Sequence, residues 1–339
     1  MYWSYLIHLG YKMWPYWKPE YWKTKTNDKG YEDPRASDPN TLLFDKAVWD
    51  EVTGLLADAG CNMLIIDVGE GMRYESHPEL AVTGSWSKDE LRSEIKRLRD
   101  LGITAVPKLN FSSIHDDWLG IYGRMISTPQ YYQVVSDVIA EVAEVFGNSG
   151  YFHIGMDEER YWEKYVFEYQ VQRGLELWWH DLRFIMDEVK KAGCTTMMWA
   201  DTFWQSKELS AEFIPKDVVL CNWYYKTFPV TSVEQINTYH FLVENALIPK
   251  PQLNKWIERL YTFHFLADND FLQMPTGSTY ERTENLPEMV RYCKTLIPNG
   301  KWFGFMQTPW RPTISEKLES HREAVVQLEK ARKIWESDI

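Results

Sequence analysis

Eight short apolar runs, each followed by a longer segment with helical spacing, are the feature that most restricts the fold of this chain. Most of the runs are nearly continuous in apolar residues, which is typical of strands with both faces covered. The predicted strands are 5–9, 63–68, 104–109, 152–156, 196–200, 218–222, 271–274 and 302–306. Eight alternating units predict an α/β fold: a (β/α)8 TIM barrel with a parallel eight-stranded sheet.

The predicted helices have recognisable starts. Ser87 and Glu90 form a capping-box pattern, Thr128 precedes a proline, and Ser315 begins the last helix. The chain contains neither a GxGxxG nor a P-loop pattern, which favours a closed barrel over a doubly wound open sheet. We therefore expect residues 1–339 to form a single domain. Two long βα segments are expected: residues 11–40 after the first strand, and an insertion at 226–260, helical near 255–265.

Composition excludes several classes of protein. The net charge of −12 argues against nucleic acid and anionic membranes as partners. No apolar run approaches the roughly 20 residues that a membrane-spanning helix needs. Cys61, Cys194, Cys221 and Cys293 have no metal-type spacing, and we predict buried free thiols. No signal peptide is visible at Met1, which predicts a cytoplasmic protein if Met1 is the native start, or a periplasmic or secreted one if a leader was removed. Nothing in the sequence predicts a particular oligomeric state.

The fourth run ends in two adjacent carboxylates, Asp157 and Glu158. Alternate residues of a strand face opposite sides, so one side of this run is apolar and the other is small or polar. The apolar set is Phe152, Ile154 and Met156, and the second set is His153, Gly155 and Asp157. Because Glu158 is next in sequence, it can share a pocket with Asp157 only if the strand breaks there. The simpler interpretation is that the two acids cap the next helix.

Polar and aromatic residues also follow the other predicted strands. In a barrel of this kind, the C-terminal ends of the strands carry the chemistry. The chain has 17 Trp, 20 Tyr and 15 Phe, and flat rings with a polar edge suit the faces of sugars, although most single rings in a protein are packing residues. The candidate binding residues are His8, Asp67, Glu70, His115, Trp199, Asp201, Trp223, Tyr225, Tyr280 and Trp310.

The fourth run resembles a known motif. The segment 153–158, His-Ile-Gly-Met-Asp-Glu, is similar to the His-x-Gly-Gly-Asp-Glu motif of the family 20 glycoside hydrolases, the β-N-acetylhexosaminidases. Weaker similarity extends over most of the chain, from about residue 1 to 335. It includes the helix-to-strand segment that starts at Ser87, the position of His115, and the tryptophan segments 198–201, 222–223 and 308–310.

The chain departs from the family pattern at several positions. Met156 replaces the second glycine of the motif. His8 or Lys12 stands where the family has an arginine that grips sugar hydroxyls. Lys108 replaces a glutamate after the third strand, and Pro312 replaces one after the last tryptophan. The small domain that commonly precedes the barrel is not seen. These departures concern the identity of the sugar more than the type of reaction.

The resemblance implies an exo-acting retaining hydrolase of terminal β-linked N-acetylglucosamine or N-acetylgalactosamine, with an amino sugar glycoside as partner and no metal or organic cofactor. Glu158 would be the general acid/base. Asp157 would orient the substrate's own 2-acetamido group, which attacks the anomeric carbon, an exception to the usual two-carboxylate scheme. The remaining candidates would bind the sugar. Tyr225 or Tyr280 would donate a hydrogen bond to the acetamido oxygen, and the three tryptophans would pack against the sugar. The polar candidates would contact the sugar hydroxyls or support the residues that do: Asp67, Glu70, His115 and Asp201.

Two alternatives remain open at this point. One is a glycosidase of another type, with Glu158 as acid and a separate nucleophile such as Asp201 or Glu281, about 5–5.5 Å away if configuration is retained. The other is a non-catalytic carbohydrate-binding barrel, which the absent arginine and glutamate favour.

Overall fold

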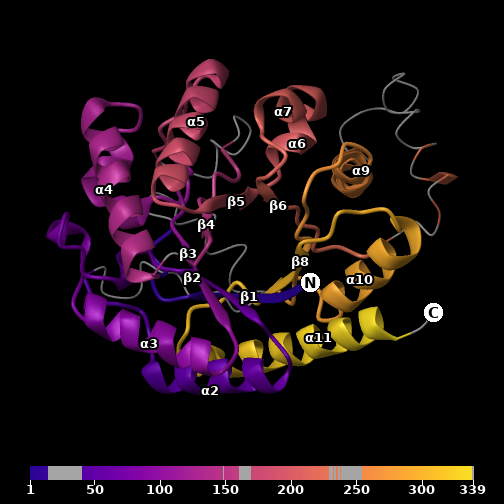
Figure 1. Ribbon diagram of the computed structural model, residues 1–339, viewed down its shortest axis with the longest axis horizontal. Coiled ribbons are helices and arrows are strands. Elements are labelled where there is room, and N and C mark those ends of the chain that lie inside the picture. The colour runs from indigo at the N-terminus through magenta and orange to yellow at the C-terminus, as the bar shows by residue number, and fades with distance from the viewer. Residues whose placement is uncertain are drawn as a thin grey trace.

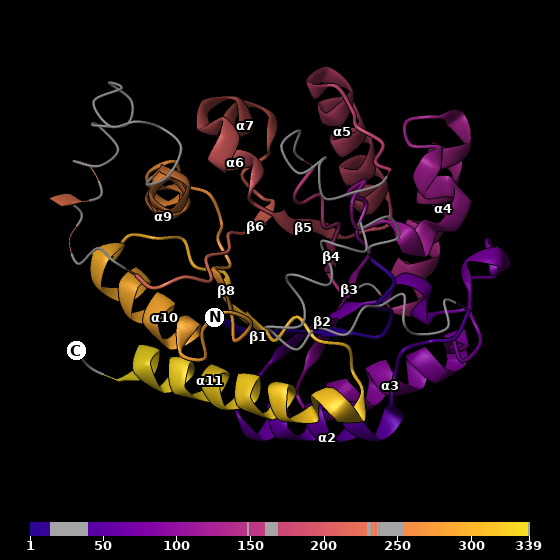
Figure 2. The same cartoon turned by 180° about the vertical axis from the view of Figure 1, so that it is seen from behind.

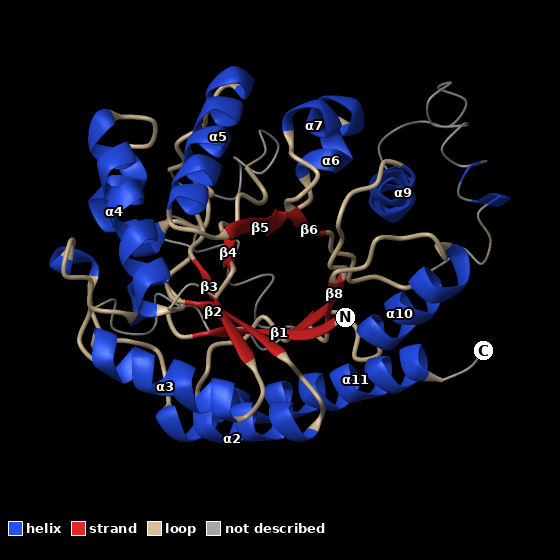
Figure 3. Ribbon diagram, viewed as in Figure 1, coloured by secondary structure: helices blue, strands red, loops and turns tan. Residues whose placement is uncertain are grey.

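Eight parallel strands form a nearly closed barrel, and helices surround it (Figures 1 and 3). The computed structural model describes residues 1–13, 40–147, 149–159, 169–228, 232, 234, 235, 237 and 254–337. The strands are β1 Tyr2–His8, β2 Met63–Asp67, β3 Thr104–Lys108, β4 Tyr151–His153, β5 Thr195–Trp199, β6 Val219–Cys221, β7 Thr276–Ser278 and β8 Gly304–Thr308. Their order, β6-β5-β4-β3-β2-β1-β8-β7, is that of a TIM barrel. Isolated parallel bridges, Leu220 with Gln273 and Trp223 with Thr276, lie across the remaining gap.

The helices alternate with the strands, as the sequence predicts. They are α2 Lys46–Asp58, α3 Lys88–Asp100, α4 Pro129–Val145, α5 Leu175–Lys191, α6 Thr202–Gln205, α7 Lys207–Phe213, α9 Asn254–Asp268, α10 Asn285–Leu296 and α11 Leu318–Glu336, with 3-10 turns η2 Gly69–Gly71, η3 Pro78–Leu80, η4 Asp117–Arg124 and η6 Ser315–Lys317. The last helix packs on the first elements of the chain, because α11 lies against α2 and β1 (Figure 2). The ring of helices is thereby closed on this side.

Local sequence signals explain where several helices start. Ser87 and Glu90 form a complete capping box at the start of α3, and the Thr128 side chain accepts a hydrogen bond from the Tyr131 backbone N–H at the start of α4. The last helix is preceded by the short turn η6, which begins at Ser315. The predicted helix near 255–265 is α9. The rest of the 226–260 insertion, and nearly all of the 11–40 loop, lie outside the described residues.

The prediction for the seventh strand is wrong. Residues 271–274 form isolated bridges, from Gln273 to Leu220 and to Trp302, and the regular strand is β7, beginning at Thr276. Pro275 separates the two stretches, and a proline cannot donate a hydrogen bond to a strand ladder. The fourth strand is also shorter than predicted. β4 ends at His153, because Gly155 and Met156 have φ of 69° and 66°, outside the range of a strand.

Two apolar cores hold the barrel. One lies between the strands and the helices, and it includes Phe152, Ile154 and Met156, as the alternation in the fourth run predicts. The other is smaller, with Leu6, Ile65 and Val106 among its members, and these lie at alternate positions of their strands. All four cysteines are buried free thiols, as predicted. Within the described ranges, no helix is both long and apolar enough to cross a lipid bilayer.

Candidate active site

The end of β4 turns sharply, and this turn brings two neighbouring acids to one histidine. Positive φ values at Gly155, Met156 and Glu158 break the strand. As a result, the Asp157 Oδ2 and Glu158 Oε2 atoms lie 3.4 Å and 3.3 Å from the same His115 Nε2. The sequence allowed the two acids to share a pocket only if the strand breaks here. It does break, and both acids lie in one polar cluster. The Asp157 side chain is 11% exposed and the Glu158 side chain is 31% exposed, so Glu158 is the more accessible acid.

Side chains that follow β3 and β5 hold this turn in place. Asn110 donates from Nδ2 to Asp157 Oδ1 at 2.8 Å, and its Oδ1 accepts from the Met156 N–H at 3.2 Å. The Ser112 hydroxyl donates to the Asp157 carbonyl. On the other side, Asp201 Oδ2 accepts from the Glu158 N–H at 2.9 Å. Asp201, a predicted binding residue, thus contacts the backbone of the acid-bearing turn.

The charges in this cluster are strongly coupled. Burial opposes protonation of His115, but the carboxylates of Asp157 and Glu158 outweigh it and raise the pKa of His115 to about 9. Burial also raises the pKa of Asp157, and the neighbouring His115 opposes that rise. His115 is therefore an imidazolium at neutral pH and bridges the two acids. Within the described part of the chain, these three side chains are also the one group of His, Cys, Asp and Glu able to surround a metal ion, but that would require His115 to lose its proton.

A row of polar residues lies beside this cluster, at the ends of the first four strands. The strand register places His8 next to Asp67, Asp67 next to Lys108, and Lys108 next to His153. All four are buried. Lys108 donates to Asp67 Oδ2, and His8 Nδ1 lies 3.3 Å from the same oxygen. Burial alone would raise the pKa of Asp67, but Lys108 and His8 lower it to about 2. The sequence predicted His8 and Asp67 as site residues and did not include Lys108.

Glu70 contacts the backbone at the start of the first βα loop. It is buried, and its carboxylate accepts hydrogen bonds from the backbone N–H groups of Tyr11 and Lys12, at 2.8 Å and 3.1 Å. Burial raises the pKa of Glu70 to about 7. A Cβ on Gly10 would lie 2.5 Å from Glu70 Oε2, so only glycine fits there. Glu70 therefore holds the start of the first βα loop.

Aromatic rings form the opposite side of the mouth. The Trp199 and Trp310 ring centroids are 5.7 Å apart, and Trp223 stacks on Tyr225 at 5.0 Å. Trp310 Nε1 donates to the Tyr225 hydroxyl at 3.0 Å, so the two pairs join. Burial raises the pKa of Tyr225, and the charges of Glu158 and Asp157 contribute to that rise, which places this ring near the acids. Four predicted aromatic residues are thus brought together.

Tyr280 makes a different set of contacts. Its ring is under the Arg311 guanidinium, 5.6 Å from the ring centroid, and its backbone N–H donates to the Ser278 hydroxyl. Of the two tyrosines predicted to contact an acetamido oxygen, Tyr225 is the one that contacts the Trp223 and Trp310 rings.

The comparisons with known proteins agree with this geometry. A model of the glycosyl hydrolase family 20 catalytic domain matches residues 122–241, a segment that contains both acids and the Trp199, Trp223 and Tyr225 rings. The chain resembles the family 20 catalytic domain. The resemblance stated from the sequence is confirmed. No curated protein sequence matches this chain.

Several solved structures have the same fold. A β-N-acetylhexosaminidase from Bacteroides fragilis has a TM-score of 0.62 at 13% identity, and the match covers 99% of this chain and 66% of that one. A family 20 exo β-N-acetylglucosaminidase from Vibrio harveyi, solved with N-acetylglucosamine, has a TM-score of 0.58 at 12% identity, covering 96% and 54%. A mutant β-hexosaminidase from Streptomyces plicatus, solved with its product, also has a TM-score of 0.58 at 12% identity, covering 98% and 62%.

Identities this low establish the shared fold. The chain spans between about half and two thirds of the length of these three structures. The proteins that it resembles are β-N-acetylhexosaminidases, which are glycoside hydrolases.

Proposed function

We propose that the protein is a retaining, exo-acting glycoside hydrolase that removes terminal β-linked N-acetylhexosamine with the help of the substrate's own acetamido group. The observation that carries the proposal is the shared contact of Asp157 and Glu158 with His115 at the broken end of β4. Two acids that lie together but differ in exposure suit two different tasks.

Glu158, the more accessible acid, protonates the glycosidic oxygen and then activates the water of the second step. Asp157 is held through Asn110, and it orients the acetamido N–H so that the carbonyl oxygen attacks the anomeric carbon. The bond from that oxygen to the anomeric carbon forms while the bond to the leaving oxygen breaks, and the amide proton passes to the Asp157 carboxylate, which gives a neutral oxazoline. Water then attacks the same carbon, opens the oxazoline and restores the acetamido group, so configuration is retained.

Tyr225 is proposed to donate to the acetamido oxygen. Because Trp310 Nε1 already donates to the Tyr225 hydroxyl, the tyrosine proton is free to point toward a substrate. Trp199, Trp223 and Trp310 enclose the sugar face and the acetamido methyl group. His8 and Asp67 are proposed to contact hydroxyls from the polar row, and Glu70 and Asp201 support the loops around the site.

The alternative nucleophiles are already engaged. Asp201 accepts a hydrogen bond from the Glu158 backbone, and Glu281 forms an ion pair with Lys226. Both contacts favour the substrate's own amide as the nucleophile over a separate carboxylate.

A panel of aryl β-glycosides with and without the 2-acetamido group tests the proposal. We expect release of the aryl alcohol from the N-acetylglucosamine or N-acetylgalactosamine glycoside, and little from the glucoside or galactoside. Efficient cleavage of glycosides without the acetamido group would support a separate nucleophile. Binding of the amino sugar without release from any glycoside would support a non-catalytic barrel.

A further inference from the structure

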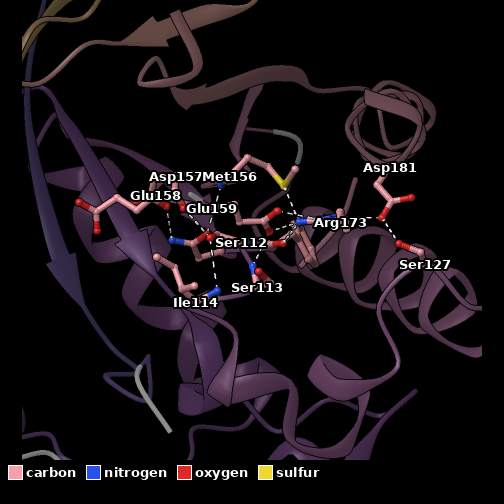
Figure 4. A network of polar contacts seen from close by, with 12 residues as sticks. Ser112, Ser113, Ile114, Ser127, Met156, Asp157, Glu158, Glu159, Arg173 and Asp181 are labelled. Carbon is pink, nitrogen blue, oxygen red and sulfur yellow. Dashed lines mark hydrogen bonds and ion pairs between the residues drawn. The ribbon is translucent and has the colours of Figure 1, made fainter. Parts of the chain in front are cut away.

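A third acid follows the two in the cluster, and it faces a different partner. Glu159 pairs with Arg173, and both side chains are buried, 7% and 1% exposed. In Figure 4, Glu158 extends to one side of the turn, while Glu159 extends to the other side, toward Arg173. Three consecutive acids are therefore divided between two environments, and only the first two contact His115.

Arg173 joins several elements behind the site. Its guanidinium donates to Glu159, to the Phe111 carbonyl at 3.1 Å and, from Nη1, to Asp181 Oδ2 of α5 at 3.0 Å. The same guanidinium lies 3.9 Å from the sulfur of Met156. One buried cation thus contacts the loop after β3, the turn after β4, and helix α5 (Figure 4).

Each end of this network is fixed in turn. Asp181 accepts hydrogen bonds from the hydroxyls of Ser127 and Tyr132, both at 2.6 Å, which connects α5 to α4. Glu159 accepts from the Ser113 backbone N–H, two residues before His115. The pair therefore links the loop that carries His115 to the turn that carries the two acids.

The turn needs such support because its backbone is strained. Met156 and Glu158 have φ of 66° and 60°, which residues other than glycine rarely adopt. Strained conformations of this kind persist only where the surroundings over-determine them. Met156 stands at the position of a glycine in the family motif, and here its side chain packs outward on Arg173.

We propose that Arg173 and Glu159 are positioning residues, whose buried ion pair fixes the turn after β4 so that Asp157 and Glu158 both reach His115. The role of the turn in catalysis rests on the proposed function, whereas the geometry of the cluster does not. Removal of Arg173 leaves the buried carboxylates of Glu159 and Asp181 without their shared cation, and loss of the Glu159 charge leaves Arg173 bound to Asp181 but no longer tied to the turn.

Glu159→Gln is the main test, because it keeps the shape of the side chain and leaves the Arg173–Asp181 pair intact. Glu94→Gln is the matched control. Glu94 also pairs with an arginine, Arg97, and its side chain is 14% exposed, but it connects α3 to Trp49 of α2, away from the turn.

Two experiments are done on both variants. Steady-state kinetics on the aryl N-acetylhexosaminide give kcat and KM. NMR titration gives the pKa of His115, whose signal is assigned by its loss in His115→Asn. For Glu159→Gln we expect kcat to fall about 10- to 100-fold, as displacements near 1 Å do, with KM within about threefold. We also expect the His115 pKa to fall from about 9 toward its ordinary value, because its carboxylate partners move away. Glu94→Gln should leave kcat, KM and the His115 pKa unchanged.

Arg173 is tested by rescue. Arg173→Ala should lose activity as Glu159→Gln does, and added guanidinium should restore kcat in a saturable way, which a general loss of stability would not permit. If Arg173→Ala does not fold, Glu159→Gln decides alone.

The proposal is wrong if either kcat or the His115 pKa keeps its wild-type value in Glu159→Gln. If the wild-type protein hydrolyses none of the glycosides, the proposed function fails. The NMR titration, which needs no substrate, then decides the positioning role by itself.

Discussion

The two sides of the barrel mouth are built differently. The side formed by β2, β3 and β4 carries charged and amide groups joined by directional contacts, such as those of Asn110 and His115 with Asp157. The side formed by β5, β6 and β8 carries stacked rings with few polar contacts, chiefly the one from Trp310 to Tyr225. A missing partner leaves a buried charge unpaired on the first side, whereas rings can repack on the second. Substitutions should therefore have larger effects on the charged side.

The largest effect is expected at Glu158. Glu158→Gln removes the proton donor with little change of shape, and general acid catalysis typically contributes about 10²–10⁴-fold. We expect a loss of kcat of at least that size on glycosides with poor leaving groups. With a dinitrophenyl leaving group, which needs no protonation, the first step should be much less affected. Steady-state and burst kinetics on the two substrates measure the difference, and equal losses on both would contradict the role of Glu158.

The next effect concerns His115 and pH. Its pKa of about 9 in the folded protein is higher than the ordinary 6.5, so the protonated ring stabilises the fold fully below pH 6.5. That contribution is lost as the pH rises through about 9. A pKa shift of this size contributes on the order of 3 kcal/mol to the free energy of unfolding. Urea unfolding between pH 6 and 9.5 should show a decline that is absent in His115→Asn. Parallel curves for the two proteins would argue against the contact with both acids.

Only some of the residues on the charged side could be predicted from the sequence. The acids were predicted because they end an apolar run, and His115 because it follows the third strand. Lys108 and Asn110 follow the third predicted strand but were not among the predicted binding residues, and Arg173 was not singled out at all. Their roles depend on contacts with residues between 8 and 47 positions away, and no local pattern encodes such contacts.

On the aromatic side, Tyr225→Phe should have a smaller effect. It removes the hydroxyl proposed to donate to the acetamido oxygen, which is the atom that forms the new bond to the anomeric carbon. A hydrogen bond of ordinary strength is worth about 0.5–1.5 kcal/mol, so we expect kcat/KM to fall about threefold to tenfold. Tyr280→Phe, on the ring that lies under Arg311, is the control and should leave kcat/KM unchanged. An equal effect of the two variants would remove the preference for Tyr225.

The smallest effect is expected at Trp310. Trp310→Phe keeps an aromatic ring against Trp199 but loses the hydrogen bond to the Tyr225 hydroxyl. Because the bond acts on the substrate only through Tyr225, we expect KM to rise about twofold to threefold with kcat nearly unchanged, a loss below that of one ordinary hydrogen bond. A loss of kcat as large as that of Glu158→Gln would show that the aromatic side is as sensitive as the charged one.

The fold was more predictable than its details. Apolar runs and helix caps such as Ser87 are local signals, and they gave the barrel and most of its strands. The errors lie where tertiary contacts override the local pattern. Residues 271–274 have the composition of a strand, but Pro275 interrupts the ladder, and β7 follows it. Met156 continues the apolar alternation in sequence, but it adopts a positive φ beside Arg173.

The most direct test of the central claim is the rate of wild-type hydrolysis on aryl N-acetylglucosaminides whose acetamido methyl group carries none, one, two or three fluorine atoms. Fluorine withdraws electrons from the amide oxygen. If Asp157 orients that oxygen for attack on the anomeric carbon while Glu158 protonates the leaving group, kcat should fall steeply with each fluorine. A rate that does not depend on fluorination, with tight binding of all four substrates, would contradict the account.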